Sequence, residues 1–151
     1  MATETLHFKI GLAGTYWDKR PQFSIAVGKQ QFEVAREVTA PSGEVFFVEF
    51  DATINEGFVD LEISLDNKTN SDVVKDNYET EDFVIVNDML LNIRSIEIDE
   101  INLGNLLYSK SKFVSEDPDR PTLNNCIDLG WNGTWRLTFE SPYYIWLLSN
   151  I

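Results

Sequence analysis

The chain has a single cysteine, Cys126, and a single histidine, His7. One cysteine cannot form a disulfide within the chain, and the sequence has no zinc-ligand spacing, no Gly-x-Ser-x-Gly and no phosphate-binding glycine loop. Basic residues are scarce too, because 12 lysines and arginines face 25 acids, giving a formal charge of -13. Binding to nucleic acid or to an anionic membrane surface needs positive charge. The sequence therefore argues against both partners.

Long hydrophobic runs are also missing. The longest unbroken run, Tyr143–Leu148, has six residues, whereas a helix that crosses a bilayer needs about 20. The first residues, Met1–Thr5, contain neither the basic nor the apolar stretch of a secretion signal. We therefore expect a protein that is made in the cytoplasm and does not insert into a membrane.

What the sequence does contain is a regular alternation of apolar and polar residues. Hydrophobic residues make up 43% and aromatic residues 13% of the 151 positions, which is enough for a hydrophobic core. Apolar residues recur at every second position, the period of a half-buried strand, in segments 6–10, 23–27, 32–34, 48–54, 59–65 and 135–139. Turn-forming residues separate these segments at short intervals. The pattern predicts one domain, residues 1–151, with an all-β fold: an antiparallel β-sandwich of the jelly-roll type.

Three local features refine this prediction. Ile93 and Ile96 are both apolar but break the period of two, which indicates a β-bulge between them. Trp135 keeps the period of its strand and is expected in the core. Tyr143–Leu148 is apolar at every position, which predicts a strand buried within the sandwich or at a contact between subunits.

Carboxylates crowd the segment 66–88. It holds seven acids and two bases, namely Asp66, Asp72, Asp76, Glu79, Glu81, Asp82 and Asp88 against Lys68 and Lys75. Neighbouring carboxylates repel one another, and a calcium ion, which takes about six to eight oxygen ligands, would relieve that repulsion. The spacing is not that of an EF-hand. A solvated acidic loop without a metal is the alternative that the residues leave open.

The segment 87–99, Asn-Asp-Met-Leu-Leu-Asn-Ile-Arg-Ser-Ile-Glu-Ile-Asp, leads from this loop into a strand. Together with the strand end Leu65-Asp66-Asn67 it forms a region, residues 61–99, that resembles the calcium-dependent xylan-binding carbohydrate-binding modules. In those modules Asn-Asp follows one strand, and a motif of similar apolar pattern leads into another. The matching positions are Asp88, Leu91, Ile93, Ile96 and Ile98. Met89-Leu90 stands where those modules usually have Arg-Asn. The resemblance implies a non-catalytic domain that binds a glycan through calcium, with Asp88 as a metal ligand and Asp66, Asp72, Asp76 and Asp82 as further candidates.

Two aromatic loops are candidate sugar-binding surfaces, because the apolar faces of sugars stack on exposed aromatic rings. Tyr16 and Trp17 follow the first strand, and Trp131 lies in a second loop between glycines. The alternative is that Trp17 and Trp131 only cap the ends of the core, since tryptophan is seldom fully exposed or fully buried.

No catalytic constellation stands out in the sequence. His7 lies in an alternating strand segment, where we expect it to face solvent rather than act as a base. Among 25 acids, chance pairs of carboxylates are certain, so such a pair does not indicate a glycosidase. We therefore predict that the protein is not an enzyme.

The C-terminal half carries a second resemblance. Residues 125–135 and 141–148 resemble small uncharacterised proteins of tailed phages, especially those of marine cyanobacteria. This likeness implies a viral protein, and together with the first resemblance it leads us to expect a phage protein that recognises a glycan. The competing interpretation is a virion structural or assembly protein whose sandwich contacts only other proteins. Tyr143–Leu148 is the segment expected to contact a second copy of the chain or other virion proteins.

Overall fold

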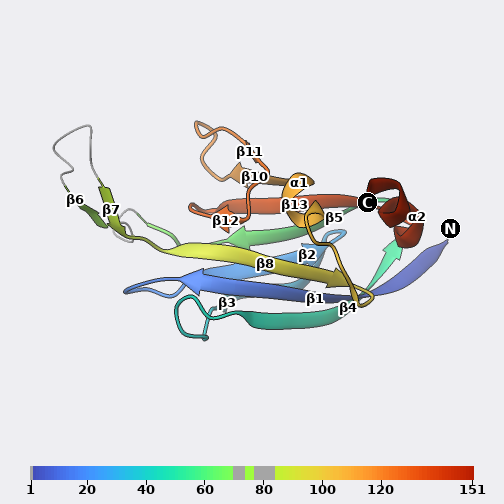
Figure 1. Cartoon of the computed structure of the whole chain (residues 1–151), viewed down its shortest axis with the longest axis horizontal. Coiled ribbons are helices and arrows are strands. Elements are labelled where there is room, and N and C mark those ends of the chain that lie inside the picture. Colours follow the sequence, from blue (N-terminus) through green and yellow to red (C-terminus); the bar gives the residue numbers. More distant parts are fainter. Residues whose placement is uncertain (1, 70–73, 77–83) are drawn as a thin grey trace.

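Two antiparallel sheets lie face to face along the long axis of the molecule (Figure 1). The computed structural model describes residues 2–69, 74–76 and 84–151. Across sheet A the order is β12 (Asp128–Leu129), β8 (Leu90–Ile98), β1 (Thr3–Thr15) and β4 (Phe46–Asn55), with β9 (Ile101–Asn102) paired to β8. Across sheet B it is β11 (Leu123–Asn124), β10 (Ser111–Ser115), β13 (Gly133–Ser141), β5 (Gly57–Leu65), β2 (Gln22–Val27) and β3 (Gln30–Glu37). The predicted all-β sandwich is confirmed.

A short hairpin, β6 (Val74–Asp76) and β7 (Val84–Asn87), extends beyond one end of the sandwich (Figure 1). The chain reaches it from the end of β5 and returns from it into β8. Both termini lie at the opposite end (Figure 1). The hairpin end and the terminal end are therefore distinct surfaces.

The core lies between the two sheets and follows the alternation in the sequence. On β1 the side chains of Leu6, Phe8 and Ile10 are buried, while their neighbours point outward. Trp135 on β13 is fully buried as expected, and its indole N–H donates to the carbonyl of Cys126 at 2.8 Å. Each buried apolar side chain of this size stabilises the fold by about 1.5–3 kcal/mol. The hydrogen bond removes the cost of burying the indole N–H.

The predicted β-bulge is also present. Strand β8 pairs with β1 so that Ser95 lies opposite Gly11 and Ile93 lies opposite Leu12, which leaves Arg94 as an extra residue. Because of this insertion, Ile93 and Ile96 both point into the core although they are three positions apart.

The prediction of a strand at Tyr143–Leu148 is wrong, because this segment belongs to helix α2 (Tyr143–Asn150). A short apolar run does not distinguish a strand from a helix by its period. Pro142 lacks the N–H that would continue β13. The carboxylate of Glu4 accepts the N–H of Tyr143 at 2.8 Å, which stabilises the helix N-terminus. Tyr143 and Leu147, one turn apart, then pack against the core.

A second helix, α1 (Leu106–Ser109), forms a single turn between β9 and β10. Within the described residues, neither α1 nor α2 has the length and apolar character that a membrane-crossing helix requires.

Candidate functional site

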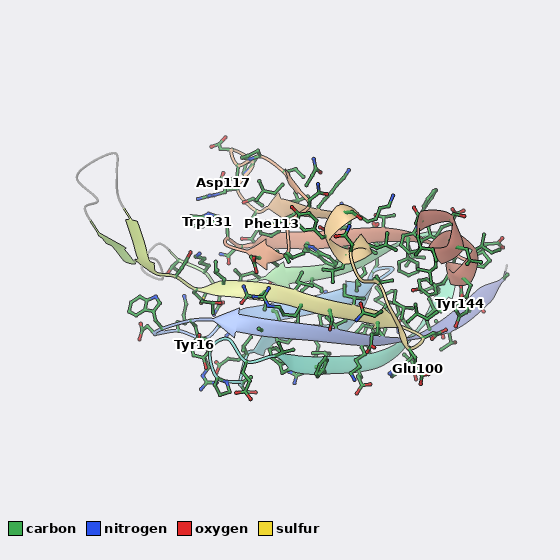
Figure 2. All side chains as sticks on the ribbon, viewed as in Figure 1. Tyr16, Glu100, Phe113, Asp117, Trp131 and Tyr144 are labelled. Carbon is green, nitrogen blue, oxygen red and sulfur yellow. The ribbon has the colours of Figure 1, made fainter. Side chains whose placement is uncertain are left out.

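A cleft opens at the hairpin end of the sandwich, beside the strand ends of sheet B. The antiparallel register brings Leu65 of β5 opposite Gly133 of β13, and Ser115 of β10 opposite the same glycine. The loops that follow β5 and β10 therefore meet the loop that precedes β13. The cleft has a volume of about 560 Å³ and is lined by Lys68, Thr69, Ser115, Glu116, Asp117, Arg120, Trp131 and Asn132. Figure 2 shows Asp117 and Trp131 close together at this end.

Asn132 ties the three loops together. Its side-chain oxygen accepts the N–H of Lys68 at 2.7 Å, and its side-chain nitrogen donates to the carbonyl of Lys68 at 2.9 Å. Its own carbonyl accepts the N–H of Glu116 at 3.0 Å. Gly133 permits this close approach, because a Cβ there would lie 2.4 Å from the carbonyl oxygen of Val114. Hydrogen bonds from the side chain and the backbone of Asn132 thus hold the three loops together.

A buried ion pair lies beside these hydrogen bonds. The side chain of Lys68 is only 1% exposed, and its Nζ lies 2.5 Å from Oδ1 of Asp88. The same oxygen accepts the N–H of Met89 at 2.8 Å. A buried ammonium group is costly unless a carboxylate compensates it. In this structure Asp88 therefore neutralises Lys68.

The guanidinium group of Arg120 lies over the indole ring of Trp131. The guanidinium carbon of Arg120 lies 3.5 Å from the ring centroid, and the ammonium of Lys68 lies 5.1 Å from it. Both distances allow a cation–π attraction. The loop that bears Arg120 is fixed by hydrogen bonds from the N–H of Arg120 to the carbonyl of Asp117 (3.1 Å) and from the N–H of Asp117 to Oγ of Ser115 (3.1 Å).

Of the five predicted metal ligands, Asp66 and Asp88 are the two whose side chains the structure describes. Asp66 accepts hydrogen bonds from the hydroxyl groups of Ser24 (2.7 Å) and Ser64 (2.8 Å), whereas Asp88 is held by Lys68. No group of three histidine, cysteine or acidic side chains suited to a metal occurs in the part of the chain that the structure describes. Asp66 and Asp88 are thus both engaged by groups of the protein itself. Of the remaining candidates, Asp72 and Asp82 lie outside the described residues, and Asp76 is described only as part of strand β6.

The first aromatic loop lies at the same end of the sandwich but outside the lining of the cleft. Tyr16 is half-buried; its hydroxyl donates to the carbonyl of Ala40 at 2.9 Å, and its N–H donates to Oγ of Ser42 at 3.0 Å. The guanidinium of Arg20 lies 5.3 Å from its ring. Trp17 is 45% exposed. Of the three predicted aromatic residues, Trp131 is the one that lines the cleft.

Sequence reasoning missed Lys68, Asp117, Arg120 and Asn132 as members of this site. A signal existed for Asn132, which stands between Trp131 and Gly133. Lys68 offered none, because a lysine beside an acidic loop is expected in solvent. Its burial results from the contact with Asp88, which lies 20 residues away.

Comparison with known proteins shows a likeness of fold. No family model and no curated protein sequence matches the chain. Among solved structures, the selenomethionine form of vCBM60, described in connection with two families of calcium-dependent carbohydrate-binding modules linked by circular permutation, matches with a TM-score of 0.51 and 11% identity, over 87% of this chain and 89% of that one. vCBM60 in complex with galactobiose gives a TM-score of 0.46 and 10% identity, over 89% and 97% of the two chains. At this identity, the first match supports the sandwich architecture alone.

Proposed function

We propose that this protein is a non-catalytic carbohydrate-binding domain whose cleft at the hairpin end holds a neutral sugar. The observation that carries the proposal is the cleft itself, which combines an aromatic side chain, Trp131, with a dense set of hydrogen-bonding groups. Its volume of about 560 Å³ falls in the range of sites that hold small ligands. The sandwich shared with a calcium-dependent carbohydrate-binding module is consistent with this role.

The charges in the cleft disfavour an anionic ligand. The buried ammonium of Lys68 is already neutralised by Asp88, so the cleft presents one cation, Arg120, beside two anions, Glu116 and Asp117. A phosphate would therefore be repelled, whereas a neutral sugar would not. The hydroxyl groups of a sugar donate and accept hydrogen bonds. They can therefore be satisfied by such a mixed lining.

Binding without catalysis fits the placement of the carboxylates. Glycoside hydrolysis needs two carboxyl groups that flank the scissile bond. Glu116 and Asp117 are successive residues of one loop, and Asp117 accepts the N–H of Asp119 at 2.9 Å. Both acidic residues in the described lining of the cleft therefore belong to one loop.

Calcium belongs to the proposal as a separate requirement. The similar structure comes from work on calcium-dependent modules, and the segment 66–88 is rich in carboxylates. Because Asp88 is engaged by Lys68, the ligands for the ion would come chiefly from Asp72, Asp76 and Asp82. Calcium bound there would reduce the repulsion within the segment.

A role in protein contacts is the second candidate, and one observation favours it. Helix α2 exposes Ile145 and Leu148, which are 64% and 72% accessible. These residues lie at the terminal end, away from the cleft (Figure 1). An origin in a phage, a place in a virion and folding in the cytoplasm remain proposals that rest on the sequence. The two roles use different surfaces and can be tested separately.

Titration calorimetry with xylo- and cello-oligosaccharides tests the first role. We expect saturable binding by the wild-type protein and loss of binding in Trp131→Ala. Phe58→Ala is the matched control, since Phe58 is an exposed aromatic residue outside the cleft. The proposal fails if the wild-type protein binds no neutral oligosaccharide at millimolar concentration, or if both variants bind as the wild type does.

A further inference from the structure

We infer that Arg120 is the residue that binds the sugar, through two adjacent hydroxyl groups, and that Trp131 serves to hold its guanidinium in place. This inference rests on the proposed carbohydrate-binding function and deepens it. It assigns the polar contact to an arginine and restricts the ligand to neutral sugars with neighbouring free hydroxyls.

The indole ring of Trp131 is already covered by the guanidinium of Arg120. The guanidinium carbon of Arg120 lies 3.5 Å from the ring centroid. A sugar that stacked on this surface would place its carbon atoms at the same separation, about 3.5–4.0 Å. The guanidinium therefore occupies the position that direct stacking on this surface would need. A sugar in the cleft meets Arg120 before it meets the indole.

The guanidinium of Arg120 has N–H donors that its contacts with the described residues do not use. A guanidinium carries five N–H donors in a rigid plane. Stacking uses the flat surface of the group and leaves its edge open. Within the described part of the chain, the ion-pair contact of Arg120 is that of Nε with Oδ2 of Asp117, and at 3.8 Å it is longer than a hydrogen bond. The side chain is 38% exposed and lines the cleft. Its free N–H groups are thus available to a ligand.

The guanidinium of Arg120 is preorganised. The turn from Asp117 to Arg120 is closed by a backbone hydrogen bond of 3.1 Å. Trp131 fixes the plane of the guanidinium, and Asn132 holds the loop that bears Trp131 against Lys68. Ordering a long side chain costs free energy when a ligand binds. Here the protein has already ordered it.

Arg120 and Asp117 together suit a neutral sugar with two adjacent hydroxyl groups. Two neighbouring N–H groups of a guanidinium match two adjacent oxygen atoms. Asp117, beside Arg120, supplies a carboxylate that can accept hydrogen bonds from the same two hydroxyl groups. A uronic acid would also offer two oxygens to Arg120. It would, however, face Glu116 and Asp117 within a protein of formal charge -13, so the neutral sugar is favoured.

The test is titration of the wild-type protein and four variants with xylo- and cello-oligosaccharides, and with oligogalacturonate as the charged counterpart. Arg120→Ala should weaken binding of the neutral sugars about tenfold or more, since a hydrogen bond to a charged group is lost. Arg120→Lys keeps the charge but lacks the planar pair of donors, and should weaken it nearly as much. Trp131→Phe keeps an aromatic ring under the guanidinium and should change affinity by less than about threefold.

The matched control is Arg36→Ala. Like Arg120, Arg36 is paired with an acid three residues earlier, Glu33, and lies over an aromatic ring, that of Phe23 at 5.8 Å. It lies on β3, outside the cleft, and its removal should leave affinity unchanged.

The outcomes separate the two proposals. Unchanged or tighter binding by Arg120→Ala, with the wild type binding normally, overturns the inference and leaves the carbohydrate-binding function standing. Preference of the wild type for oligogalacturonate overturns the restriction to neutral sugars. No binding of any of these sugars by the wild type overturns the proposed function, and the inference with it.

Discussion

The ammonium group of Lys68 and the carboxylate of Asp88 form a 2.5 Å ion pair at the hairpin end of the sandwich, with the lysine side chain almost fully buried. The sequence suggested that Asp88 holds a metal ion. In the structure its carboxylate is paired with a buried cation of its own chain. We therefore expect that removing Asp88 lowers the stability of the fold, whatever its effect on metal binding.

Asp88→Ala should lower the free energy of unfolding by about 3–5 kcal/mol, because it leaves a buried ammonium without a partner. Urea denaturation of the two proteins measures this difference. Glu33→Ala is the control, since the Glu33–Arg36 pair lies at the surface and should contribute less than about 1 kcal/mol. If the double variant Lys68→Met/Asp88→Ala regains most of the lost stability, the pair is the cause. A silent Asp88→Ala would contradict this account.

Calcium should stabilise the fold if the segment 66–88 binds it. A ligand that binds only the folded state adds about 2.7 kcal/mol at a hundredfold excess over its dissociation constant, which raises Tm by several degrees in a domain of this size. Thermal melts with calcium and with chelator provide the measurement. The triple variant Asp72→Asn/Asp76→Asn/Asp82→Asn should lose the response. Identical melts of the wild type in both conditions would remove calcium from the proposal.

The pKa of the His7 imidazole should lie above its ordinary value. Its Nδ1 lies 2.7 Å from Asp51 and its Nε2 lies 3.2 Å from Glu49, on the outer surface of sheet A. Hydrogen bonds to Asp51 and then to Glu49 raise the pKa of the imidazole above 6.5. Because the folded-state pKa is raised, the stabilising contribution is complete below the unfolded pKa of about 6.5 and is lost as pH rises through the folded value.

Nuclear magnetic resonance can follow His7 without ambiguity, since the chain has one histidine. The titration midpoint should move down in Asp51→Asn and stay in place in Glu140→Gln, whose acid lies on sheet B. A midpoint at or below 6.5 in the wild type would contradict the contacts seen here.

Helix α2 should mediate self-association. Its exposed Ile145 and Leu148 form, with Tyr144 and Ile151, an apolar surface that a second copy would shield from water. Light scattering after size exclusion should show an oligomer for the wild type at high micromolar concentration and a monomer for Ile145→Ser/Leu148→Ser. Phe58→Ser, at another exposed aromatic residue, should leave the mass unchanged. A wild-type monomer at that concentration ends the prediction.

The parts of the fold that depend on local periodicity were predictable from the sequence. The alternation in β1 and β13 and the bulge at Arg94 each follow from which positions are apolar. Helix α2 was not predictable in this way, because an unbroken apolar run carries no period. Its first N–H group, that of Tyr143, is accepted by Glu4, which lies 139 residues away, and so distant a contact leaves no local signal.

The candidate site was only partly predictable for a related reason. Trp131 could be identified from its aromatic character and its neighbouring glycines. The burial of Lys68 and the stacking of Arg120 on Trp131 are contacts between loops that follow different strands. Such contacts depend on strand order and register, which a single sequence does not display.

The most direct test of the carbohydrate-binding cleft is a chemical-shift map of the isotopically labelled protein during titration with a xylo-oligosaccharide. The account predicts that the indole N–H of Trp131, the side-chain amide of Asn132 and the guanidinium N–H of Arg120 shift together as the sugar saturates the site, while the indole N–H of Trp146 on α2 does not move. Shifts confined to residues outside the cleft, or a spectrum unchanged by the sugar and by the other neutral oligosaccharides, would contradict it.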